Sequence, residues 1–339
     1  MKPLSNAAAL ISDGDLIYYY TAFYADDAFL VILGDKKYLF TDMRYYSAAK
    51  TEANAEVVLL KGNSLEDFLK EKGVTEIKLI FECTSAAVYD KFSKLGYKIS
   101  DCTLEHDKKA IVKSKNELEL IKKACEIAEE AFNKTLPCIK EGVTELEIAA
   151  LLEYNFKLLG ASGPSFDTIV AFNEGSSVPH YKTSNKKLER GSVILMDFGC
   201  KYEGYCSDMT RTLFFGEPTN EFLSVYEAVK KAHELAFSEA KSNVKASAVD
   251  KAARNYLESL GYGENFTHSL GHGIGVKIHE QPRLNFRSEQ VLEEGMVFSV
   301  EPGVYLEGKF GVRLENTVAI IDGKAQSFMK TSLQPIIIR

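Results

Sequence analysis

Four carboxylates stand on two segments that each have the pattern of a β-hairpin, and together they could hold metal ions. Asp197 lies inside the apolar run 193–199, and Asp208 follows a turn that we expect near Tyr202 and Glu203. If the hairpin folds about that centre, Asp197 and Asp208 are cross-strand partners on one face. Because an isolated ionised carboxylate inside a buried strand is unfavourable, Asp197 must be neutral, paired or bound to a cation.

The second pair of acids repeats this geometry. Glu301 and Glu315 are equally spaced about Gly308, so they too become cross-strand partners. Like charges placed opposite each other repel, and two such hairpins in one chain imply an attractor of opposite sign, for which divalent metal is the economical candidate. Spacing alone leaves open two ordinary hairpins whose acids face solvent or pair with Arg211 and Arg313.

Histidines add to this set of acids. Three of the six lie in the segment 268–280, a glycine-rich turn that we expect to run into a strand at 276–278. Glycines let the backbone approach a ligand closely. His106 and His233 lie outside every motif, and we expect both on the surface. The histidines that could join the site are His180, His268, His272 and His279.

Four carboxylates and one imidazole form an oxygen-dominated set of ligands. Such a set suits a pair of Mn, Co or Zn ions and differs from a thiolate zinc site. Two ions about 4 Å apart can share one water, lower its pKa towards roughly 7 to give a bridging hydroxide, and polarise a carbonyl. The residue types therefore indicate hydrolysis.

These motifs, in this order, resemble the Xaa-Pro peptidases of the pita-bread fold, which include aminopeptidase P and prolidase. The resemblance implies two divalent ions, with Mn favoured, and hydrolysis of the bond between an N-terminal residue and proline. A looser similarity to the family's N-terminal domain runs through 20–23 and 39–45, with Ala22 where relatives commonly have glycine. The segments that carry the main resemblance are Met196 to Gly199, Tyr205 to Thr212, His268 to Glu280, Ser299 to Gly303 and Val312 to Asn316.

The resemblance also implies a set of metal ligands. Asp197 would bind one metal, whereas Asp208 and Glu315 would bridge both. His272 and Glu301 would complete the second metal. Glu301 would in addition take a proton from the water and pass it to the leaving proline nitrogen.

Further residues would act on the substrate. By resemblance, His180, His268 and His279 would contact the substrate and stabilise the tetrahedral intermediate. Arg313 and Tyr305 share strand faces with acids of the set, so they could hold substrate or orient a ligand. Arg283 is a candidate anchor for the free carboxylate of a dipeptide, which favours prolidase slightly, although a solvated loop arginine remains open.

The elements that must position these residues fall into two parts that divide near residue 110. Residues 1–110 alternate β-rich runs, beginning at 16–20, with helical stretches such as 64–72, which predicts an α/β domain. Residues 111–339 predict a long amphipathic helix, a second helix capped by Thr144, and then strands, two helices and further strands. With the resemblance, this gives an α+β chain in which a pita-bread catalytic domain follows a smaller creatinase-like α/β domain.

Composition excludes several classes of protein. The chain is 45% hydrophobic and 26% charged, as a globular protein is, and its net charge of -7 disfavours a nucleic-acid partner. No apolar run approaches the roughly 18 to 20 residues of a membrane span, and no basic leader opens the chain. The six cysteines form no CxxC pair, so we expect free thiols and a cytoplasmic protein. The resemblance implies a homodimer.

Two other functions remain open. A methionine aminopeptidase shares the metal ligands and a similar Gly-His-Gly-Ile-Gly run. The preceding domain, His268, the run 178–180 and Arg313 fit the proline-directed branch better. A metal-free binding module of the same fold would have lost ligands, whereas all five are present in this chain. The sequence does not separate an Xaa-Pro aminopeptidase from an Xaa-Pro dipeptidase.

Overall fold

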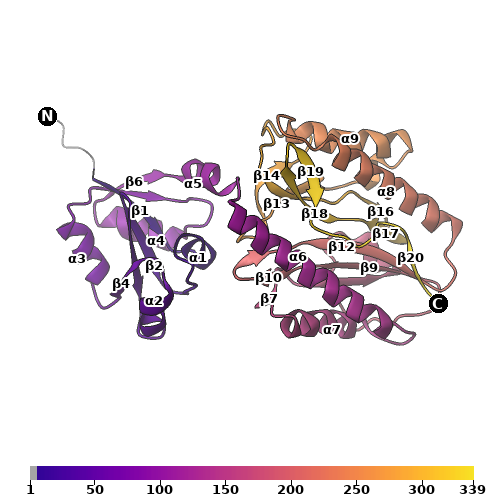
Figure 1. Ribbon diagram of the computed structural model, residues 1–339, viewed down its shortest axis with the longest axis horizontal. Helices are drawn as coiled ribbons and strands as arrows, with labels where there is room; N and C mark the ends of the chain where they lie inside the picture. The colour runs from indigo at the N-terminus through magenta and orange to yellow at the C-terminus, as the bar shows by residue number, and fades with distance from the viewer. Residues whose placement is uncertain (1–5) are drawn as a thin grey trace. The chain divides into compact units, whose positions relative to one another are not determined.

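The computed structural model describes residues 6–339, which divide into two compact units between Ala110 and Ile111 (Figure 1). We call residues up to 110 the smaller unit and residues 111–339 the larger unit. Among the described residues, no helix combines the length and the apolar character that crossing a membrane requires.

The smaller unit is built on a mixed six-stranded sheet in the order β4-β3-β2-β1-β5-β6. β2 pairs antiparallel with β1 and β3, and the other pairs are parallel. Helices separate the parallel strands in the sequence, as an α/β domain requires. The strands are β1 (Ala7–Ile11), β2 (Phe29–Leu33), β3 (Lys36–Thr41), β4 (Glu56–Leu59), β5 (Glu76–Leu79) and β6 (Lys98–Asp101). The helices are α1 (Gly14–Thr21), α2 (Tyr46–Glu52), α3 (Ser64–Glu71), α4 (Ala86–Lys94) and α5 (Thr103–Ala110).

One strand expected in this unit is wrong, because residues 16–20 belong to helix α1. The Asp13 side chain accepts a hydrogen bond from the backbone N–H of Leu16 at 3.0 Å and caps the helix. The helix ends at Ala22, whose backbone is left-handed with φ 57°. Glycine is the residue that adopts this conformation without strain, so an alanine is strained at this position.

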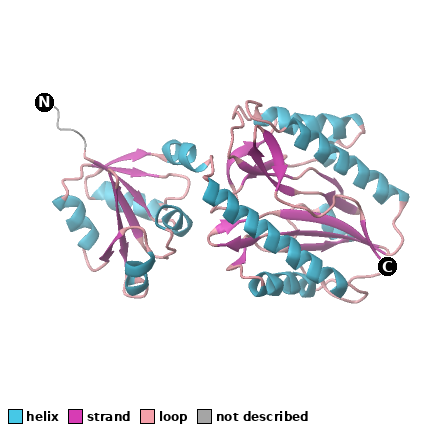
Figure 2. Ribbon diagram, viewed as in Figure 1, coloured by secondary structure: helices cyan, strands magenta, loops and turns pink. Residues whose placement is uncertain are grey.

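The larger unit places its strands between two pairs of helices (Figures 1 and 2). α6 packs with α7, and α8 packs with α9. On β9, the ring of Phe198 stacks on Phe132 of α6 at 5.5 Å and lies 6.4 Å from Phe156 of α7. The helices are α6 (Lys115–Thr135), α7 (Glu145–Leu158), α8 (Asn220–Glu239) and α9 (Ala246–Ser259), with short 3-10 turns at Leu136–Cys138, Asn173–Ser177 and Gly263–Asn265.

The strands of this unit form four sheets. Their orders are β20-β12-β9-β8, β14-β13-β15-β18-β19, β11-β10-β7 and β16-β17. The strands are β7 (Gly163–Pro164), β8 (Ile169–Phe172), β9 (Ser192–Phe198), β10 (Cys200–Tyr202), β11 (Tyr205–Cys206), β12 (Met209–Phe215), β13 (Gly271–Gly273), β14 (Glu280–Leu284), β15 (Val297–Val300), β16 (Gly303–Leu306), β17 (Phe310–Arg313), β18 (Asn316–Ile321), β19 (Lys324–Ser327) and β20 (Ile336–Ile338).

The first acid-bearing hairpin has a different register from the one expected. Tyr202 pairs with Tyr205, so the turn residues are Glu203 and Gly204, both with positive φ. This is the backbone of a type I′ turn, which matches the twist of the flanking strands. As a result Asp197 faces Thr210 rather than Asp208. The shift is two residues, an even number, so it leaves the acids on the expected face.

The second hairpin has the expected register. Gly303 pairs with Arg313 and Leu306 with Phe310, which places the turn about Gly308. The same register continues beyond the acids, where Val300 pairs with Asn316. Glu301 and Glu315 therefore occupy opposite positions, each in a break between two paired strands.

Two further expectations are corrected in this unit. Residues 276–278 form a turn and not a strand, and the backbone N–H of Gly275 donates to the carbonyl of Lys277 at 3.0 Å. His233, expected on the surface, is 2% exposed within α8 and stacks on Phe237. In the smaller unit, His106, also expected on the surface, is partly buried, and its Nδ1 atom lies 3.0 Å from the hydroxyl of Tyr20.

Candidate metal centre

A cavity of about 740 Å³ in the larger unit gathers nearly all of the residues singled out from the sequence. Its wall includes all five candidate metal ligands. Among the other candidates, only Tyr305 does not line it. The candidates that do are His180, Asp197, Asp208, His268, His272, His279, Arg283, Glu301, Arg313 and Glu315.

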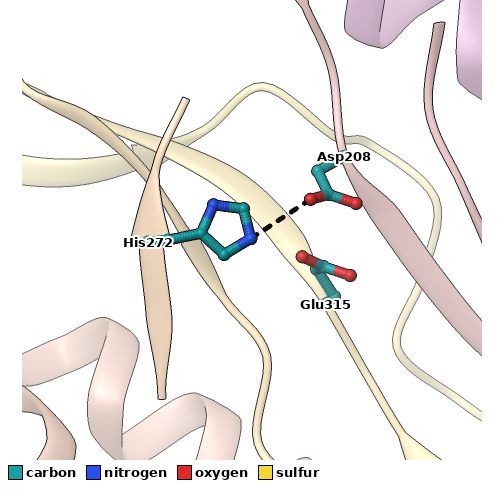
Figure 3. Close-up of side chains that lie close together, drawn as sticks. All are labelled: Asp208, His272 and Glu315. Atoms are coloured by element: carbon teal, nitrogen blue, oxygen red, sulfur yellow. Dashed lines mark ion pairs between the residues drawn. The ribbon is translucent and has the colours of Figure 1, made fainter. Parts of the chain in front are cut away.

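Three of these side chains point towards one another (Figure 3). One ligand atom each from Asp208, His272 and Glu315 lies within 4.8 Å of the others, and all three residues are buried. The Nε2 atom of His272 is 3.4 Å from Oδ2 of Asp208. Asp208 precedes β12, His272 lies on β13, and Glu315 lies between β17 and β18, so three separate segments meet at one point.

The other two acids lie beside this trio. Oε1 of Glu301 is 3.4 Å from Nε2 of His272, and it also accepts a hydrogen bond from Ser299. Asp197 sits on β9, and its Oδ2 atom is 2.5 Å from a guanidinium nitrogen of Arg313. Of the two arginines considered as partners for the acids, Arg313 therefore pairs with one of them. Arg211 instead donates to the main-chain carbonyl of Glu315 at 2.5 Å.

Buried oxygens without a donor show that a cation fits here. Oδ1 of Asp197, Oδ1 of Asp208 and Oε1 of Glu315 are all inaccessible to water and accept no hydrogen bond. Buried carboxylate oxygens are normally satisfied, so three together indicate a missing positive partner. Carboxylate and imidazole ligands are a donor set that divalent transition metals accept.

The electrostatics of the apo-protein agree with this interpretation. Burial, followed by the repulsion of Glu315, raises the pKa of Asp208 well above its usual range. Burial and then Glu301 raise the pKa of Glu315 in the same way. Burial raises the pKa of Glu301 to about 8, against the opposing influence of Arg313. It is therefore unfavourable for these carboxyl groups to be ionised together unless a cation binds between them.

Two histidines in the cavity, His268 and His272, are held neutral by burial. It lowers the pKa of His272 to about 3, with the charge of His279 adding to the effect. It lowers the pKa of His268 to about 3 as well. A neutral imidazole keeps one nitrogen free to bind a metal or accept a hydrogen bond.

A chain of hydrogen bonds links a histidine to the acids. Nε2 of His268 lies 2.8 Å from the hydroxyl of Tyr305, and Arg313 donates to the same hydroxyl at 2.7 Å. Arg313 then reaches Asp197. Tyr305 is 5% exposed and does not line the cavity, so it contacts the lining residues from the protein interior.

Two more candidates lie beside His272. The ring of His279 meets the ring of His272 edge-on, with centroids 4.3 Å apart. Arg283 on β14 is the cross-strand partner of His272 and is exposed. His180 follows the 3-10 turn at 173–177 and is exposed on the cavity wall.

Sequence reasoning missed two residues that hold the acids. Thr210 donates from its hydroxyl to Oε2 of Glu315 at 2.5 Å. Ser299 accepts from the backbone N–H of His272 at 3.1 Å and donates to Glu301 at 3.1 Å. Thr210 and Ser299 each stand two residues from a candidate acid. The period of two along a strand was therefore a signal that could have identified them.

Comparisons with known proteins match both units of the chain. Residues 119–322 match the model of the metallopeptidase family M24, and residues 1–108 match the creatinase/prolidase N-terminal domain. A curated relative, the Xaa-Pro dipeptidase of Pyrococcus furiosus, is 37% identical over 310 residues, which cover 89% of this chain and 87% of that protein.

Solved structures are similar over nearly the whole length. The X-Pro aminopeptidase of Thermotoga maritima superposes with a TM-score of 0.91 at 38% identity, over 99% of this chain and 98% of that one. The Xaa-Pro dipeptidase of Bacillus anthracis superposes with a TM-score of 0.93 at 32% identity, over 98% of this chain and 95% of that one. The similarity therefore includes both the site and the preceding unit.

Proposed function

Since the chain belongs to the metallopeptidase family M24, we propose that it is an Xaa-Pro peptidase that hydrolyses the bond between an N-terminal residue and the proline that follows. The expected pita-bread fold with a smaller N-terminal α/β domain is confirmed. The specificity rests on relatives that are named Xaa-Pro dipeptidases and an X-Pro aminopeptidase. The observation that carries the activity is the convergence of four acids and a histidine in one cavity.

Two divalent ions fit the donor set, and manganese is our proposal, with cobalt and zinc as alternatives. Asp197, Asp208, His272, Glu301 and Glu315 would hold them, with Asp208 and Glu315 shared between the two. When bound, the ions supply an activated water and polarise the scissile carbonyl.

Glu301 is suited to moving a proton. Burial raises the pKa of this carboxyl group to about 8 in the metal-free protein, and a bound cation would lower the pKa and leave a carboxylate that can accept a proton. Its Oε2 atom faces the cavity histidine His268 at 3.9 Å. In the proposed reaction Glu301 takes a proton from the attacking water and returns it to the proline nitrogen of the leaving group.

The surrounding residues would bind and orient the peptide. His180, His268 and His279 line the cavity and offer hydrogen bonds to the peptide carbonyl and to the charge that develops on its oxygen. Arg313 holds Asp197 and Tyr305 in place through its guanidinium group. Arg283 would receive the free carboxylate of a dipeptide, so we favour a dipeptidase slightly over an aminopeptidase.

We also propose a cytoplasmic location and a homodimer. All six cysteines are free, which is typical of proteins in a reducing compartment. The homodimer rests on the resemblance to the family alone.

A substrate panel tests the proposal. The purified protein is assayed with an Xaa-Pro dipeptide, an Xaa-Pro-Yaa tripeptide and a Met-Ala-Yaa tripeptide, each with Mn, Co and Zn. We expect cleavage of the proline peptides and none of the methionine peptide. Cleavage of the methionine peptide alone would identify a methionine aminopeptidase. No bound divalent ion and no hydrolysis of any peptide would identify a binding module.

A further inference from the structure

An ion pair on helix α9 lies against the segment that carries His268. Arg254 donates to both carboxylate oxygens of Asp250, from Nε at 2.8 Å and from Nη2 at 2.9 Å. Asp250 is fully buried, whereas 22% of the Arg254 side chain is exposed. The two residues are one turn apart, so the pair is fixed to a single rigid element.

The pair holds the backbone of residues 266–270 at three points. Arg254 donates from Nη1 to the carbonyl of Phe266 at 3.0 Å and from Nη2 to the carbonyl of His268 at 2.9 Å. Asp250 accepts from the N–H of Leu270 at 3.1 Å. The guanidinium carbon of Arg254 also lies 4.3 Å from the ring centroid of Phe266. Planar donors in a fork can satisfy two carbonyls and a carboxylate together, which a lysine cannot do.

The segment held in this way presents the His268 ring to the site. Its Nε2 atom meets the hydroxyl of Tyr305 at 2.8 Å, and its ring packs edge-on against Phe266. The carbonyl of Leu270 accepts from the N–H of Glu301 at 2.9 Å. The residues on either side of His268 are thus tied to α9 while its ring faces the cavity.

We propose that Arg254, held by Asp250, is a positioning residue that sets the orientation of the His268 ring in the cavity. The expected effect on catalysis rests on the proposed function. The effect on the orientation of the His268 ring does not. Arg254 does not line the cavity, so it acts through the backbone carbonyls of Phe266 and His268. An imidazole displaced by a fraction of an ångström loses its alignment with the reacting atoms, which lowers kcat more than it changes KM.

The metal ligands should be less affected, because other contacts hold them. Glu315 is bonded by Thr210, the backbone of Asp208 by Thr317, and the backbone of His272 by Ser299. A change at Arg254 should therefore leave the affinity for Mn²⁺ close to that of the wild type. An unchanged affinity for Mn²⁺ would distinguish a displaced His268 ring from a general disruption of the site.

A double-mutant cycle tests the coupling. Arg254→Lys, His268→Ala and the double variant are compared on an Xaa-Pro peptide. The control is Arg287→Lys, since Arg287 is exposed and its guanidinium group lies over the ring of Phe286 and not on the backbone of residues 266–270. We expect Arg254→Lys to lower kcat about 10- to 100-fold with KM changed less than about twofold. It should have little further effect once His268 is alanine. A loss of the same size in the His268→Ala background overturns the proposal.

A second measurement does not depend on activity. In protein labelled with ¹⁵N-histidine, the ring signals of His268 are identified as those absent from the His268→Ala spectrum. Arg254→Lys should shift these signals, leave those of His106 in place, and keep the Kd for Mn²⁺ within about threefold. Unchanged His268 signals contradict the proposal even if the protein cleaves no peptide. Absence of peptide hydrolysis in the wild type, with the shift present, contradicts only the proposed function.

Discussion

The guanidinium of Arg313 and the carboxylate of Asp197 form an ion pair at 2.5 Å inside the larger unit, where their side chains are 3% and 13% exposed. Arg313 also donates to the hydroxyl groups of Thr210 and Tyr305. A buried pair of this kind contributes little net stability, because desolvation of both charges offsets their attraction. Removal of one partner is costly, because it leaves the other charge buried and alone.

Replacement of Arg313 should therefore destabilise the metal-free protein strongly. We expect Arg313→Met to lower the free energy of unfolding by about 3–5 kcal/mol, since Asp197 then keeps a buried charge without a partner. Saturating Mn²⁺ should reduce this loss, because a cation would neutralise Asp197 in place of the guanidinium. Urea unfolding with and without Mn²⁺ measures both effects.

The control for Arg313 is an exposed arginine in a similar pair. Arg44 bonds to Asp42, with side chains 59% and 32% exposed. Arg44→Met should change the free energy of unfolding by less than about 1 kcal/mol, with no dependence on Mn²⁺. Equal losses for both variants would contradict the argument from burial.

Thr210 should affect metal affinity without touching a metal. Thr210→Val keeps the shape of the side chain but removes the hydroxyl that donates to Glu315. Partners that orient a metal ligand typically contribute about 10- to 100-fold in affinity, so we expect a rise of that size in the Kd for Mn²⁺, measured by equilibrium dialysis. Thr212→Val is the matched control, since Thr212 is equally buried but bonds only to the backbone of Arg313. An equal change in Kd for both variants would argue against a role for the Thr210 bond.

Ala22 offers a test of backbone strain in the smaller unit. Its left-handed φ of 57° costs an alanine energy that glycine does not incur. We expect Ala22→Gly to raise the free energy of unfolding by about 0.5–1 kcal/mol in urea denaturation. Ala53 also follows a helix but has extended backbone, with φ −78° and ψ 135°. Ala53→Gly should lower stability by a similar amount, because only the unfolded chain gains freedom.

The sequence predicted the second hairpin better than the first for a physical reason. The register about Gly308 depends on one glycine in the centre of a short turn, and the strands on both sides obey it. In the first hairpin, Glu203 adopts a positive φ together with Gly204. We expected Gly204 beside the turn, but it is the second residue of the turn. The cross-strand partner of Asp197 is therefore Thr210, two positions beyond the expected Asp208.

Other errors arose where local pattern and tertiary context compete. An apolar run of five residues at 16–20 has the composition of a strand, but the cap at Asp13 starts a helix. The burial of Leu16, Ile17 and Thr21 then follows a helical face. His233 had no motif to mark it, and its burial depends on the packing of α8 against distant strands, which spacing along the chain does not reveal.

The metal-free protein should lose stability as the pH rises from about 6.5 to about 8. The pKa of Glu301 is raised in the folded state to about 8, so the stability it contributes is lost as the pH approaches that value. Asp208 and Glu315 shift in the same direction. His268 and His272 have lowered pKa values, and their contribution is lost only as the pH falls below about 6.5. Above about pH 6.5, these carboxyl groups therefore determine whether stability rises or falls with pH.

Urea unfolding at three pH values across this range measures the slope. Each carboxyl group that releases its proton only on unfolding contributes up to about 1.4 kcal/mol per pH unit. Glu301→Gln should reduce the slope, since the amide does not titrate. Saturating Mn²⁺ should abolish or reverse it, because a metal binds the deprotonated acids. A flat profile without metal would show that the acids are not held protonated.

Arg283 should distinguish dipeptides from longer peptides. It is the cross-strand partner of His272, so the two side chains lie on the same face of the β13–β14 pair, and both line the cavity. A charge-assisted hydrogen bond to the free carboxylate of proline is typically worth about 1.5–3 kcal/mol. We expect Arg283→Ala to raise KM for an Xaa-Pro dipeptide about tenfold or more, and KM for an Xaa-Pro-Yaa tripeptide by less than about twofold. Arg287→Ala, four residues further along and outside the cavity lining, should change neither value. Equal effects of Arg283→Ala on the two substrates would remove the reason to favour a dipeptidase.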